Sequence, residues 1–375
     1  MRIVVDCRLY SVQAGIGRYI RNLIFNLQKI DKKNTYFILL LKKDYDLLVN
    51  QRNFVRVVAD FQWYGITEQL KLPKLLHKLN PDLVHFPHFN LPILYRGKFV
   101  VTIHDLTHKY FAMKRATTHG RLIYFLKQIG YKVVFKKAAT ESGTIITPSH
   151  YIKNLIAKEY SIPEEKMVVT YEAVDHKFIS ISENIKKGEI ENVMKKFSVS
   201  LPYLFYVGNA HPHKNVEGLI KAFFKLKEKY QNLKLVLSGP DHYFWQRLKK
   251  EYQLSEIVYT GYVTDEEMVA LYKNASSFVM PSFEEGFGIP LLEAMASFAP
   301  VVSSNAGALP EVGGDAALYF DPRNTNDMAD KISQVLDSEK LKEELIDKGQ
   351  KRVKFFSWEK LAKQTLEVYR KETIL

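Results

Sequence analysis

Short apolar runs alternate with longer amphipathic stretches along the first half of the chain. The runs are rich in β-branched residues and are bounded by turn or charged residues, a pattern that predicts buried strands. The predicted strands cover residues 4–7, 36–41, 55–59, 83–86, 99–103, 144–147 and 167–170. Stretches with helical spacing lie between them, near 17–29, 66–79, 119–139 and 149–160. This alternation predicts a parallel sheet covered by helices.

The second half repeats this pattern after a polar stretch at 178–200, which predicts a linker or a surface helix. Strands are predicted near 203–207, 234–238, 257–260, 277–281, 300–303 and 318–320, with helices between them and three more from about 325 onward. The chain therefore reads as two doubly wound α/β domains in series, 1–178 and 179–357. Ligands bind at the carboxyl ends of the strands in such sheets, so two facing domains would form a cleft.

The composition agrees with a two-domain globular protein. The 375 residues exceed what one ordinary core organises, and 46% of them are hydrophobic while 25% are charged. No apolar run approaches the roughly 18 residues that a membrane span needs. The first residues enter a strand pattern directly and show no apolar region typical of a signal peptide. With the single cysteine, Cys7, this indicates a reducing cytoplasm.

The positive charge is confined to one half of the chain. Residues 1–175 hold 27 Lys and Arg against 14 Asp and Glu, whereas residues 176–375 hold 27 of each, for a net charge of +13. One interpretation is a generally lysine-rich proteome. The other is that the first half faces an anionic partner, such as a membrane surface, a lipid diphosphate or nucleic acid.

The segment SFEEGFGIPLLEAM at 282–295 carries the strongest chemical pattern. It follows a predicted strand, contains a Gly-x-Gly turn and leads into a predicted helix with Pro290 in its first turn. Free amides and the dipole at a helix N-terminus favour an anion, and glycines allow its close approach. Glu285 is expected on the loop and Glu293 on the first helical turn, beside the anion. Two carboxylates flanking a phosphate site suit a sugar nucleotide.

Two further positions lie at predicted strand ends. Lys214 closes a Gly/Pro loop after the strand at 203–207, where it can reach a diphosphate, or it is a solvated surface lysine. His104 follows the strand at 99–103, with Asp105 beside it. A histidine there can hydrogen-bond a sugar hydroxyl or a leaving-group oxygen while the neighbouring carboxylate orients it. Alternatively, His104 satisfies local backbone groups.

Taken in order, these motifs resemble a known family. Glu285 and Glu293 within EGFGIPLLEAM are similar to the signature of the retaining GT-B glycosyltransferases of family 4, in their mannosyltransferase-like branch. The resemblance covers nearly the whole chain. Its other matches are GIGRY at 15–19, VTIHDL at 101–106, ITPS at 146–149, PVVSSNAGALPEV at 300–312 and FSWE at 356–359.

The resemblance implies a role for each matching residue. Glu293 would bind the nucleotide ribose and Glu285 the hydroxyls of the donor sugar. Lys214 would neutralise the diphosphate, and His104 with Asp105 would lie across the cleft near the reacting centre. Further implied donor contacts, the last three beside the base, are Gly286, Phe287, Gly288, Ile289, Gly261, Tyr262 and Val263.

The chain departs from the family pattern at one position. An arginine is common after the strand glycine of the second domain, and here that residue is Asn209. The diphosphate would then lack one cation, which His213 would replace if it were protonated. Donor affinity and phosphate geometry are therefore the least constrained part of the implied site.

The resemblance also implies a fold and a reaction. The fold would be GT-B, two Rossmann-like domains with a last helix at 358–375 that crosses back to the first domain. The reaction would transfer a hexose with retention, with no metal or other cofactor, and the leaving phosphate would take the acceptor proton. Mannose from GDP-mannose is the first expectation and UDP-glucose follows, with a glycan or lipid-linked acceptor for a surface polysaccharide or glycolipid.

Weaker motifs suggest other ligands. Gly15 and Gly17 form a bare Gly-x-Gly after the first strand. The third glycine of a dinucleotide site is absent, so nicotinamide binding is rejected. The loop is expected to contact the donor phosphates or the acceptor, or to form a tight turn. Asp44 and Asp46 form an Asp-x-Asp, which suits a helix start better than a metal. A histidine set without Cys or Glu partners is not expected to bind metal; its members are His85, His88, His104 and His108.

Residues 109–137 are basic and aromatic. They could form an amphipathic helix on an anionic membrane leaflet, with Arg121, Lys132 and Lys136 contributing, or a domain helix with a basic outer face. The first interpretation predicts an enzyme peripheral to the inner face of the cell membrane. Two other classes stay open: a sugar-nucleotide epimerase or hydrolase on the same fold, and a basic non-catalytic binding protein. No basic-aromatic strand motif supports RNA recognition.

Overall fold

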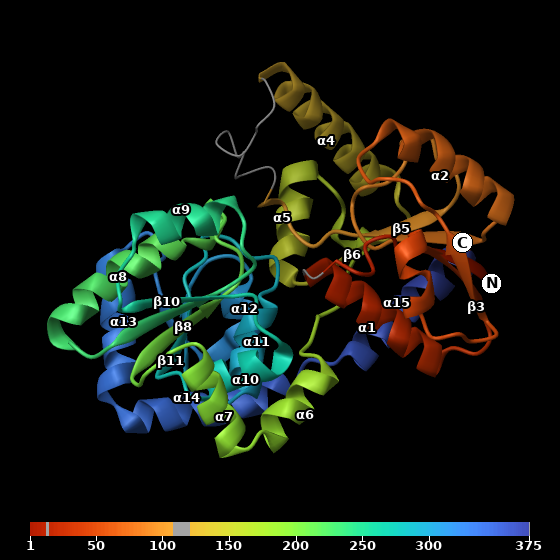
Figure 1. Cartoon of the computed structure of the whole chain (residues 1–375). Helices are drawn as coiled ribbons and strands as arrows, with labels where there is room; N and C mark the ends of the chain where they lie inside the picture. The colour runs from red at the N-terminus through yellow and green to blue at the C-terminus, as the bar shows by residue number, and fades with distance from the viewer. Residues whose placement is uncertain (13–14, 108–120, 375) are drawn as a thin grey trace. The chain divides into compact units, whose positions relative to one another are not determined.

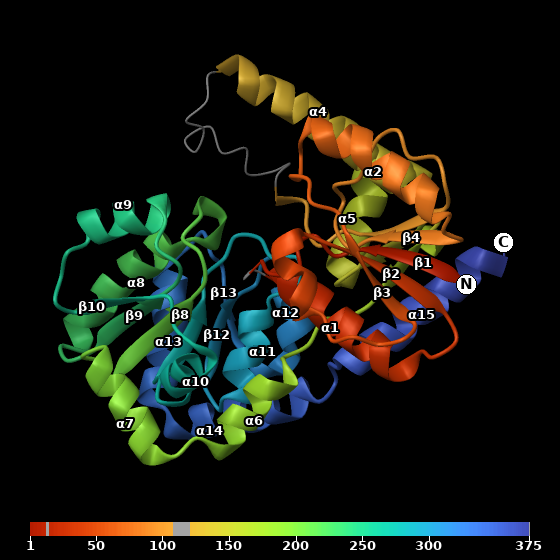
Figure 2. The same ribbon diagram turned by 45° about the vertical axis from the view of Figure 1, so that its right-hand side comes forward.

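The computed structural model describes residues 1–12, 15–107 and 121–374, apart from the side chains of 121–128. It divides into two compact units, each a parallel sheet with helices on both faces (Figures 1 and 2). The N-terminal unit comprises Met1–Glu172 and Trp358–Leu375, and the inserted unit comprises Ala173–Ser357. The predicted pair of doubly wound α/β domains is thereby confirmed.

The N-terminal unit has a seven-stranded sheet in the order β3-β2-β1-β4-β5-β6-β7. Its elements, in chain order, are β1 (Arg2–Asp6), α1 (Gly15–Ile30), β2 (Thr35–Leu40), the 3₁₀ helix η1 (Lys42–Leu47), β3 (Phe54–Val58), α2 (Ile66–Leu79), β4 (Leu83–Phe86), β5 (Phe99–Thr102), α4 (Arg121–Glu141), β6 (Ile145–Thr147), α5 (His150–Tyr160), η2 (Glu164–Lys166), β7 (Met167–Val169) and α15 (Trp358–Ile374).

The inserted unit has a six-stranded sheet in the order β10-β9-β8-β11-β12-β13. Its elements are α6 (His176–Asn184), α7 (Lys187–Lys196), β8 (Tyr203–Val207), η3 (Pro212–Lys214), α8 (Val216–Lys229), β9 (Lys234–Ser238), α9 (Tyr243–Glu251), β10 (Ile257–Gly261), α10 (Asp265–Lys273), β11 (Ser277–Met280), α11 (Ile289–Ala296), β12 (Val301–Ser304), α12 (Leu309–Gly313), η4 (Gly314–Ala316), β13 (Leu318–Phe320), α13 (Thr325–Asp337) and α14 (Glu339–Val353).

The strand order reverses once in each sheet, between β1 and β4 and between β8 and β11. In doubly wound sheets the connections on either side of such a point diverge and leave a crevice at the carboxyl ends of the two strands. The two switch points therefore mark where each unit is expected to bind a ligand.

The core of the N-terminal unit lies on the sheet face covered by α2, α4 and α5, where apolar side chains of these helices pack on the strands. Helix α15 covers the opposite face beside α1. There the hydroxyl of Tyr369 lies 2.5 Å from Nδ1 of buried His85, and Thr144 donates a hydrogen bond to Glu372 at 2.5 Å. The expectation that the last helix returns to the first domain is confirmed.

The division between the units falls at Glu172, six residues before the expected boundary at 178. The segment expected as a linker or a surface helix forms α6 and α7. Helix α6 belongs to the inserted unit because it packs on α10 and α11. Ser182 donates a hydrogen bond to the carbonyl of Ala296 at 2.9 Å, and Lys273 donates to the carbonyl of Ser182 at 2.7 Å.

Candidate functional site

In the inserted unit, the loops that follow β8 and β11 are joined at the switch point. The amide of Phe283 donates to the carbonyl of His213 at 2.8 Å. The side chain of Asn215, a buried residue with φ of 54° just before α8, donates to the carbonyl of Pro281 at 3.0 Å. Residues far apart in the sequence are thus held in one group at the carboxyl ends of adjacent strands.

Lys214 and Glu285 form an ion pair at the centre of this group. Nζ of Lys214 lies 2.8 Å from both carboxylate oxygens of Glu285. Ser282 donates a third hydrogen bond to the same carboxylate at 2.7 Å, and its own carbonyl accepts one from Ser304 at 2.6 Å. The side chains of Lys214 and Glu285 are 20% and 10% exposed. A mostly buried charge pair is stable only with such additional hydrogen bonds.

Helix α11 begins directly after this pair. Gly288 immediately precedes the helix with φ of 103°, and a Cβ there would meet Cδ2 of Leu309 at 2.7 Å, so the position requires glycine. Pro290 lies in the first turn, as predicted. The buried Phe287 and Ile289 hold the turn in place. Pro290 has no N–H and the amide of Leu291 donates to the carbonyl of Gly288 at 3.0 Å, so the attraction of this end for an anion comes mainly from the helix dipole. The role of 286–288 in donor binding stays a prediction.

Glu293 lies one turn deeper than expected. Because α11 starts at Ile289, its first turn ends before Glu293, and the placement of this carboxylate on the first turn was wrong. Its side chain is 2% exposed, and its Oε2 accepts a hydrogen bond from Tyr272 at 3.3 Å. A buried carboxylate held by a phenol is a fixed acceptor, which suits a ribose diol, but that role is untested.

The other predicted donor contacts lie at the carboxyl ends of β8 and β10 in the same sheet. Gly261 ends β10, the ring of Tyr262 is exposed, and Val263 is buried. Asn209 uses its Oδ1 to accept from the amide of His211 at 3.2 Å, so it orders its own loop. The ring of His213 stacks on that of His211, with centroids 5.8 Å apart.

In the N-terminal unit, His104 follows β5 and both of its ring nitrogens face oxygen acceptors. Nδ1 lies 3.0 Å from Oε1 of Glu172, and Nε2 lies 3.0 Å from the carbonyl of Pro87. Burial alone would lower the pKa of His104, but the hydrogen bond and charge of Glu172, the Pro87 carbonyl and Asp105 together raise it. A carbonyl only accepts, so the ring donates at Nε2, and the raised pKa favours the imidazolium form.

The carboxylate that orients His104 is therefore Glu172, and the expectation that Asp105 does so was wrong. Asp105 accepts a hydrogen bond from the amide of Thr107 at 2.8 Å and so shapes its own loop. The predicted backbone role of His104 is present through Pro87. A contact between His104 and a sugar would have to replace one of its two partners.

Comparison with known proteins places this chain in a family. The model described as "Glycosyltransferase Family 4" matches residues 14–178, and that described as "Glycosyl transferases group 1" matches residues 190–352. The O-antigen chain mannosyltransferase B of Escherichia coli is 33% identical over 294 residues, which cover 77% of this chain and 74% of that protein. The chain belongs to the family 4 glycosyltransferases.

Two other proteins are similar to this glycosyltransferase. The O-antigen chain mannosyltransferase RfbU of Salmonella typhimurium is 30% identical over 275 residues, covering 73% of this chain and 70% of that protein. A crystal structure of Anabaena HepE in complex with UDP-glucose matches with a TM-score of 0.75 at 15% identity, covering 99% of this chain and 100% of that one. The second likeness shows the shared GT-B fold.

The glycine loop of the glycosyltransferase opens helix α1, which begins at Gly15. Gly17 lies in the first turn, where a Cβ would come within 1.8 Å of the carbonyl oxygen of Val12. A Cβ on Gly15 would meet no atom of the described residues within 4 Å, its chain neighbours aside. Gly17 is thus required by close backbone packing, while a ligand contact at either glycine stays a prediction.

In the described part of the chain, the side chains of the Asp-x-Asp motif and of His85 are engaged by other groups. Asp44 is buried and accepts from Ser11 at 3.0 Å, whereas Asp46 is exposed and faces Arg56 at 3.5 Å. His85 has both ring nitrogens within 2.8 Å of hydroxyl groups. Across the described residues, no group of three or more His, Cys, Asp and Glu side chains is arranged to hold a metal; His108 lies outside those residues.

Only part of the basic region at 109–137 can be placed, because 109–120 lie outside the described residues. In α4, Lys132 and Lys136 are exposed beside Ile129 and Val133. Lys137 is buried and paired with Glu141, so it is not on this outer face. In the described part of the chain, no helix is both long and apolar enough to cross a membrane.

Sequence reasoning missed the residues that hold the predicted ones. Ser282 and Glu172 fix Glu285 and His104. Asp6 and Arg8 form a buried network with Glu68. The available signal was position: Asp6 lies at the end of the predicted strand 4–7 with Arg8 directly after it, and Glu172 lies two residues after the predicted strand 167–170, where polar side chains meet at one edge of the sheet.

Proposed function

We propose that this glycosyltransferase moves a hexose, with mannose the first candidate, from a nucleoside diphosphate sugar to a carbohydrate acceptor of a cell-surface polysaccharide or glycolipid, with retention of configuration. The observation that carries the proposal is the Lys214–Glu285 pair beside the N-terminus of α11. A cation, the positive end of a helix dipole and a fixed carboxylate within one loop group suit a diphosphate joined to a polyol.

The choice of mannose is supported by the relatives named for mannosyl transfer in O-antigen chains. UDP-glucose is the second candidate donor, since HepE was crystallised with it. In either case the donor would enter the site by separating Lys214 from Glu285. The lysine would then turn to the diphosphate and the carboxylate to the sugar hydroxyls, so that the two charges exchange one partner for another.

In the proposed reaction, the bond between the anomeric carbon and the diphosphate oxygen breaks, and the acceptor oxygen bonds to that carbon on the same face. The acceptor proton passes to an oxygen of the leaving diphosphate. Glu285 is not assigned as the base, because its carboxylate keeps the hydrogen bond from Ser282 and would face the hydroxyls of the donor sugar. Lys214 and the amides at the start of α11 would stabilise the departing charge without a metal ion.

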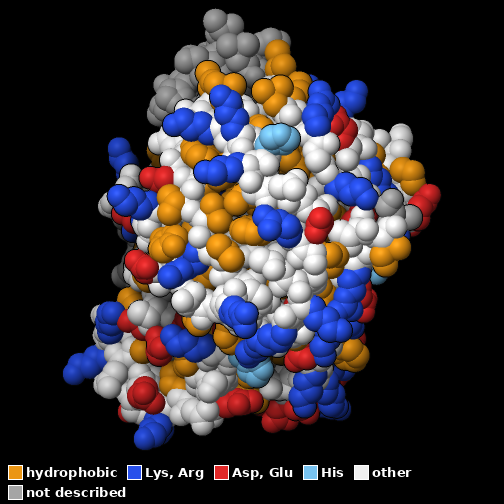
Figure 3. All heavy atoms as spheres, turned by 90° about the vertical axis from the view of Figure 1, so that its right-hand side faces the viewer, with side chains coloured by type: hydrophobic (Ala, Val, Ile, Leu, Met, Phe, Trp, Pro, Cys, Tyr) orange, Lys and Arg blue, Asp and Glu red, His pale blue; other side chains and the backbone are white. Residues whose placement is uncertain are grey.

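We further propose that the enzyme is cytoplasmic and reaches a lipid-linked acceptor at the inner membrane face. On the face shown in Figure 3, Lys and Arg side chains lie among exposed hydrophobic ones. Lys132 and Lys136 of α4 alternate with exposed Ile129 and Val133, a spacing that suits a membrane surface. Each cation near an anionic leaflet contributes roughly 1 kcal/mol.

The membrane arm is tested by co-sedimentation with vesicles containing anionic lipid. Reversal of Lys132 and Lys136 to Glu should reduce binding strongly. Reversal of two exposed lysines in the inserted unit, Lys187 and Lys195, is the matched control and should leave it intact. Equal binding by both double variants would remove the proposal.

The transferase proposal is tested by thermal shift with GDP, UDP, ADP and their sugars, with and without EDTA. One diphosphate should raise Tm markedly in wild type, independently of EDTA, and the shift should be lost in Glu293→Ala but kept in Glu191→Ala, an exposed control on α7. Donor consumption without any acceptor, giving free sugar or an isomer, would favour a hydrolase or an epimerase instead. No shift with any nucleotide would contradict a donor site.

A further inference from the structure

The N-terminal unit has a pocket of its own at its switch point. The pocket lies where β1 and β4 end, and its lining includes Asp6 at the end of β1, Arg8 just after it, and His88 and Asn90 after β4. Trp63 and Tyr64, from the segment between β3 and α2, also line it. This is the crevice in which a doubly wound sheet binds ligands, and the donor contacts of the inserted unit do not include it.

The base of the pocket is a fully buried charge network. Arg8, 1% exposed, donates to both carboxylate oxygens of Asp6 at 2.8 and 2.6 Å and to Glu68 at 2.6 Å. The amide of Asn90 donates to both oxygens of Glu68 at 2.9 and 3.1 Å. Two carboxylates against one guanidinium leave a net charge of −1, which disfavours an anionic ligand and suits the hydroxyls of a neutral one.

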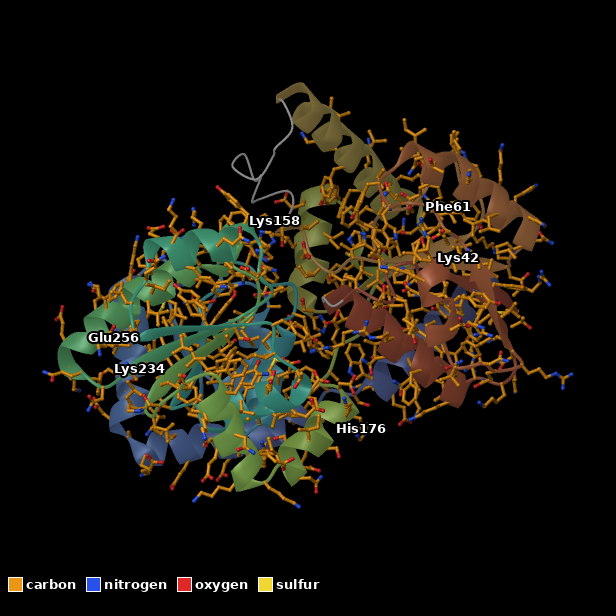
Figure 4. All side chains as sticks on the ribbon, viewed as in Figure 1. Lys42, Phe61, Lys158, His176, Lys234 and Glu256 are labelled. Atoms are coloured by element: carbon orange, nitrogen blue, oxygen red, sulfur yellow. The ribbon has the colours of Figure 1, made fainter. Side chains whose placement is uncertain are left out.

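Two donors in this pocket are not fully used. The indole nitrogen of Trp63 is buried and has no hydrogen-bond partner among the described residues. Within the same part of the chain, Nη1 of Arg8 reaches the carbonyl of Phe61 (labelled in Figure 4) at the limiting distance of 3.5 Å. An unsatisfied buried N–H costs about 1–3 kcal/mol, so such a group calls for an explanation.

The shape of the pocket fits a single inserted hydroxyl. The centre of a water-sized group has about 20 Å³ in which to move, enough for one such group, within about 320 Å³ of space that includes open solvent. A sugar would therefore place one hydroxyl between the lining side chains, which include Trp63, while the rest of it lies toward solvent.

Tyr64 is held at the mouth in a strained conformation. Its φ of 58° is unusual for a bulky residue, and its ring is 66% exposed. The strain is offset where the Tyr64 amide donates to Glu68 at 2.8 Å, which connects the exposed ring to the buried network. The ring of His88 meets it edge-on, with centroids 6.3 Å apart. An exposed aromatic ring fixed in this way presents a flat apolar surface beside the polar pocket.

From this geometry we infer that the pocket binds one neutral hexopyranose of the acceptor, with a hydroxyl donating to Asp6 and accepting from Trp63 while the sugar ring lies on Tyr64. The inference rests on the proposed function, since it supplies that function's acceptor. A phosphate or other anion is not expected here, because the buried network already carries excess negative charge.

The test uses methyl α-D-mannopyranoside, with the glucose and galactose counterparts, as probes of the full chain by saturation-transfer NMR. Wild type should bind at least one of them. Trp63→Phe keeps an aromatic ring and removes the indole N–H donor, so affinity for the glycoside should fall about fivefold to tenfold. Tyr64→Ala removes an exposed ring outside the core and should abolish the signal. Tyr243→Ala, with a 60% exposed ring on α9, is the control and should bind normally.

Thermal shift with nucleotides on the same variants separates this inference from the proposed function. Both pocket variants should keep the wild-type response to the diphosphate. Glycoside binding that depends on Trp63 and Tyr64, without any response to nucleotides, would support the pocket inference and contradict the proposed transferase function. Equal glycoside binding in all four proteins, no binding in wild type, or displacement of the glycoside by inorganic phosphate would overturn the inference.

Discussion

The Lys214–Glu285 pair makes a quantitative prediction, because its two members should be strongly coupled. Exposed ion pairs contribute about 0–1 kcal/mol, and removal of one partner from a buried pair costs roughly 3–5 kcal/mol. This pair lies between these cases: it is mostly buried, bonded at 2.8 Å to both oxygens, and supported by Ser282. We therefore expect a coupling free energy of about 2 kcal/mol.

The assay is a double-mutant cycle of Lys214→Met and Glu285→Gln, read as Tm by calorimetry on the full chain. Lys214→Met leaves a buried carboxylate without its cation and should cost about 3 kcal/mol, or roughly 6–12 °C for a unit of this size. Glu285→Gln should cost about 2 kcal/mol. The double variant should be no less stable than Lys214→Met alone, because the orphaned charge is gone.

A matched control lies in the same unit. Lys348 and Glu344 on α14 are also joined at a short distance, 2.7 Å, but are 35% and 51% exposed, so their cycle should show much weaker coupling. Additive losses for Lys214 and Glu285, or equal coupling in both pairs, would refute the reasoning that burial makes this pair strong. Nucleotide binding is a second measurement on the same variants. Glu285→Gln releases Lys214 and should still bind the nucleoside diphosphate, whereas Lys214→Met should not.

Three further predictions concern the N-terminal unit. Burial, with a smaller effect of His104, lowers the pKa of His85 to about 3. Because an unfolded histidine titrates near 6.5, the free energy of unfolding falls by roughly 1.4 kcal/mol per pH unit as pH drops below 6.5. The Tm of His85→Gln should therefore depend less on pH between 6.5 and 5 than that of wild type. Gly17→Ala places a Cβ 1.8 Å from a carbonyl oxygen and should cost at least about 2 kcal/mol, whereas Gly15→Ala should leave Tm nearly unchanged. Burial alone would lower the pKa of His104, and Glu172 raises it, so Glu172→Gln should lower this pKa in an NMR titration. Wild type loses stability as pH rises through the raised pKa of His104, and this loss should be smaller in the variant.

The fold was largely predictable because parallel strands buried on both faces appear as continuous apolar runs. The runs at 83–86 and 203–207 coincide with β4 and β8. The division between the units falls at Glu172 and not at 178 because α6 packs on α10 and α11, a contact that no local pattern reveals. Glu293 was placed one turn early because the helix start depends on the left-handed conformation of Gly288.

The site was predictable as a set of positions but not as a set of contacts. The sequence placed Lys214 and Glu285 at strand ends, yet only the strand order brings the loops after β8 and β11 together. Glu172 holds His104 across 68 positions of sequence, from a strand two places away in the sheet. Adjacency in sequence favoured Asp105 instead, because it shows nothing about side-chain direction.

The return of α15 to the N-terminal unit has a consequence for how the protein is made. During synthesis, the whole of Ala173–Ser357 leaves the ribosome before α15 does, so the inserted unit can fold while the first sheet still lacks the helix that covers His85. Until Tyr369 arrives, that sheet face exposes apolar surface beside α1. Nascent chains stalled before Trp358 should therefore be the species that chaperones bind and proteases cleave within Met1–Glu172.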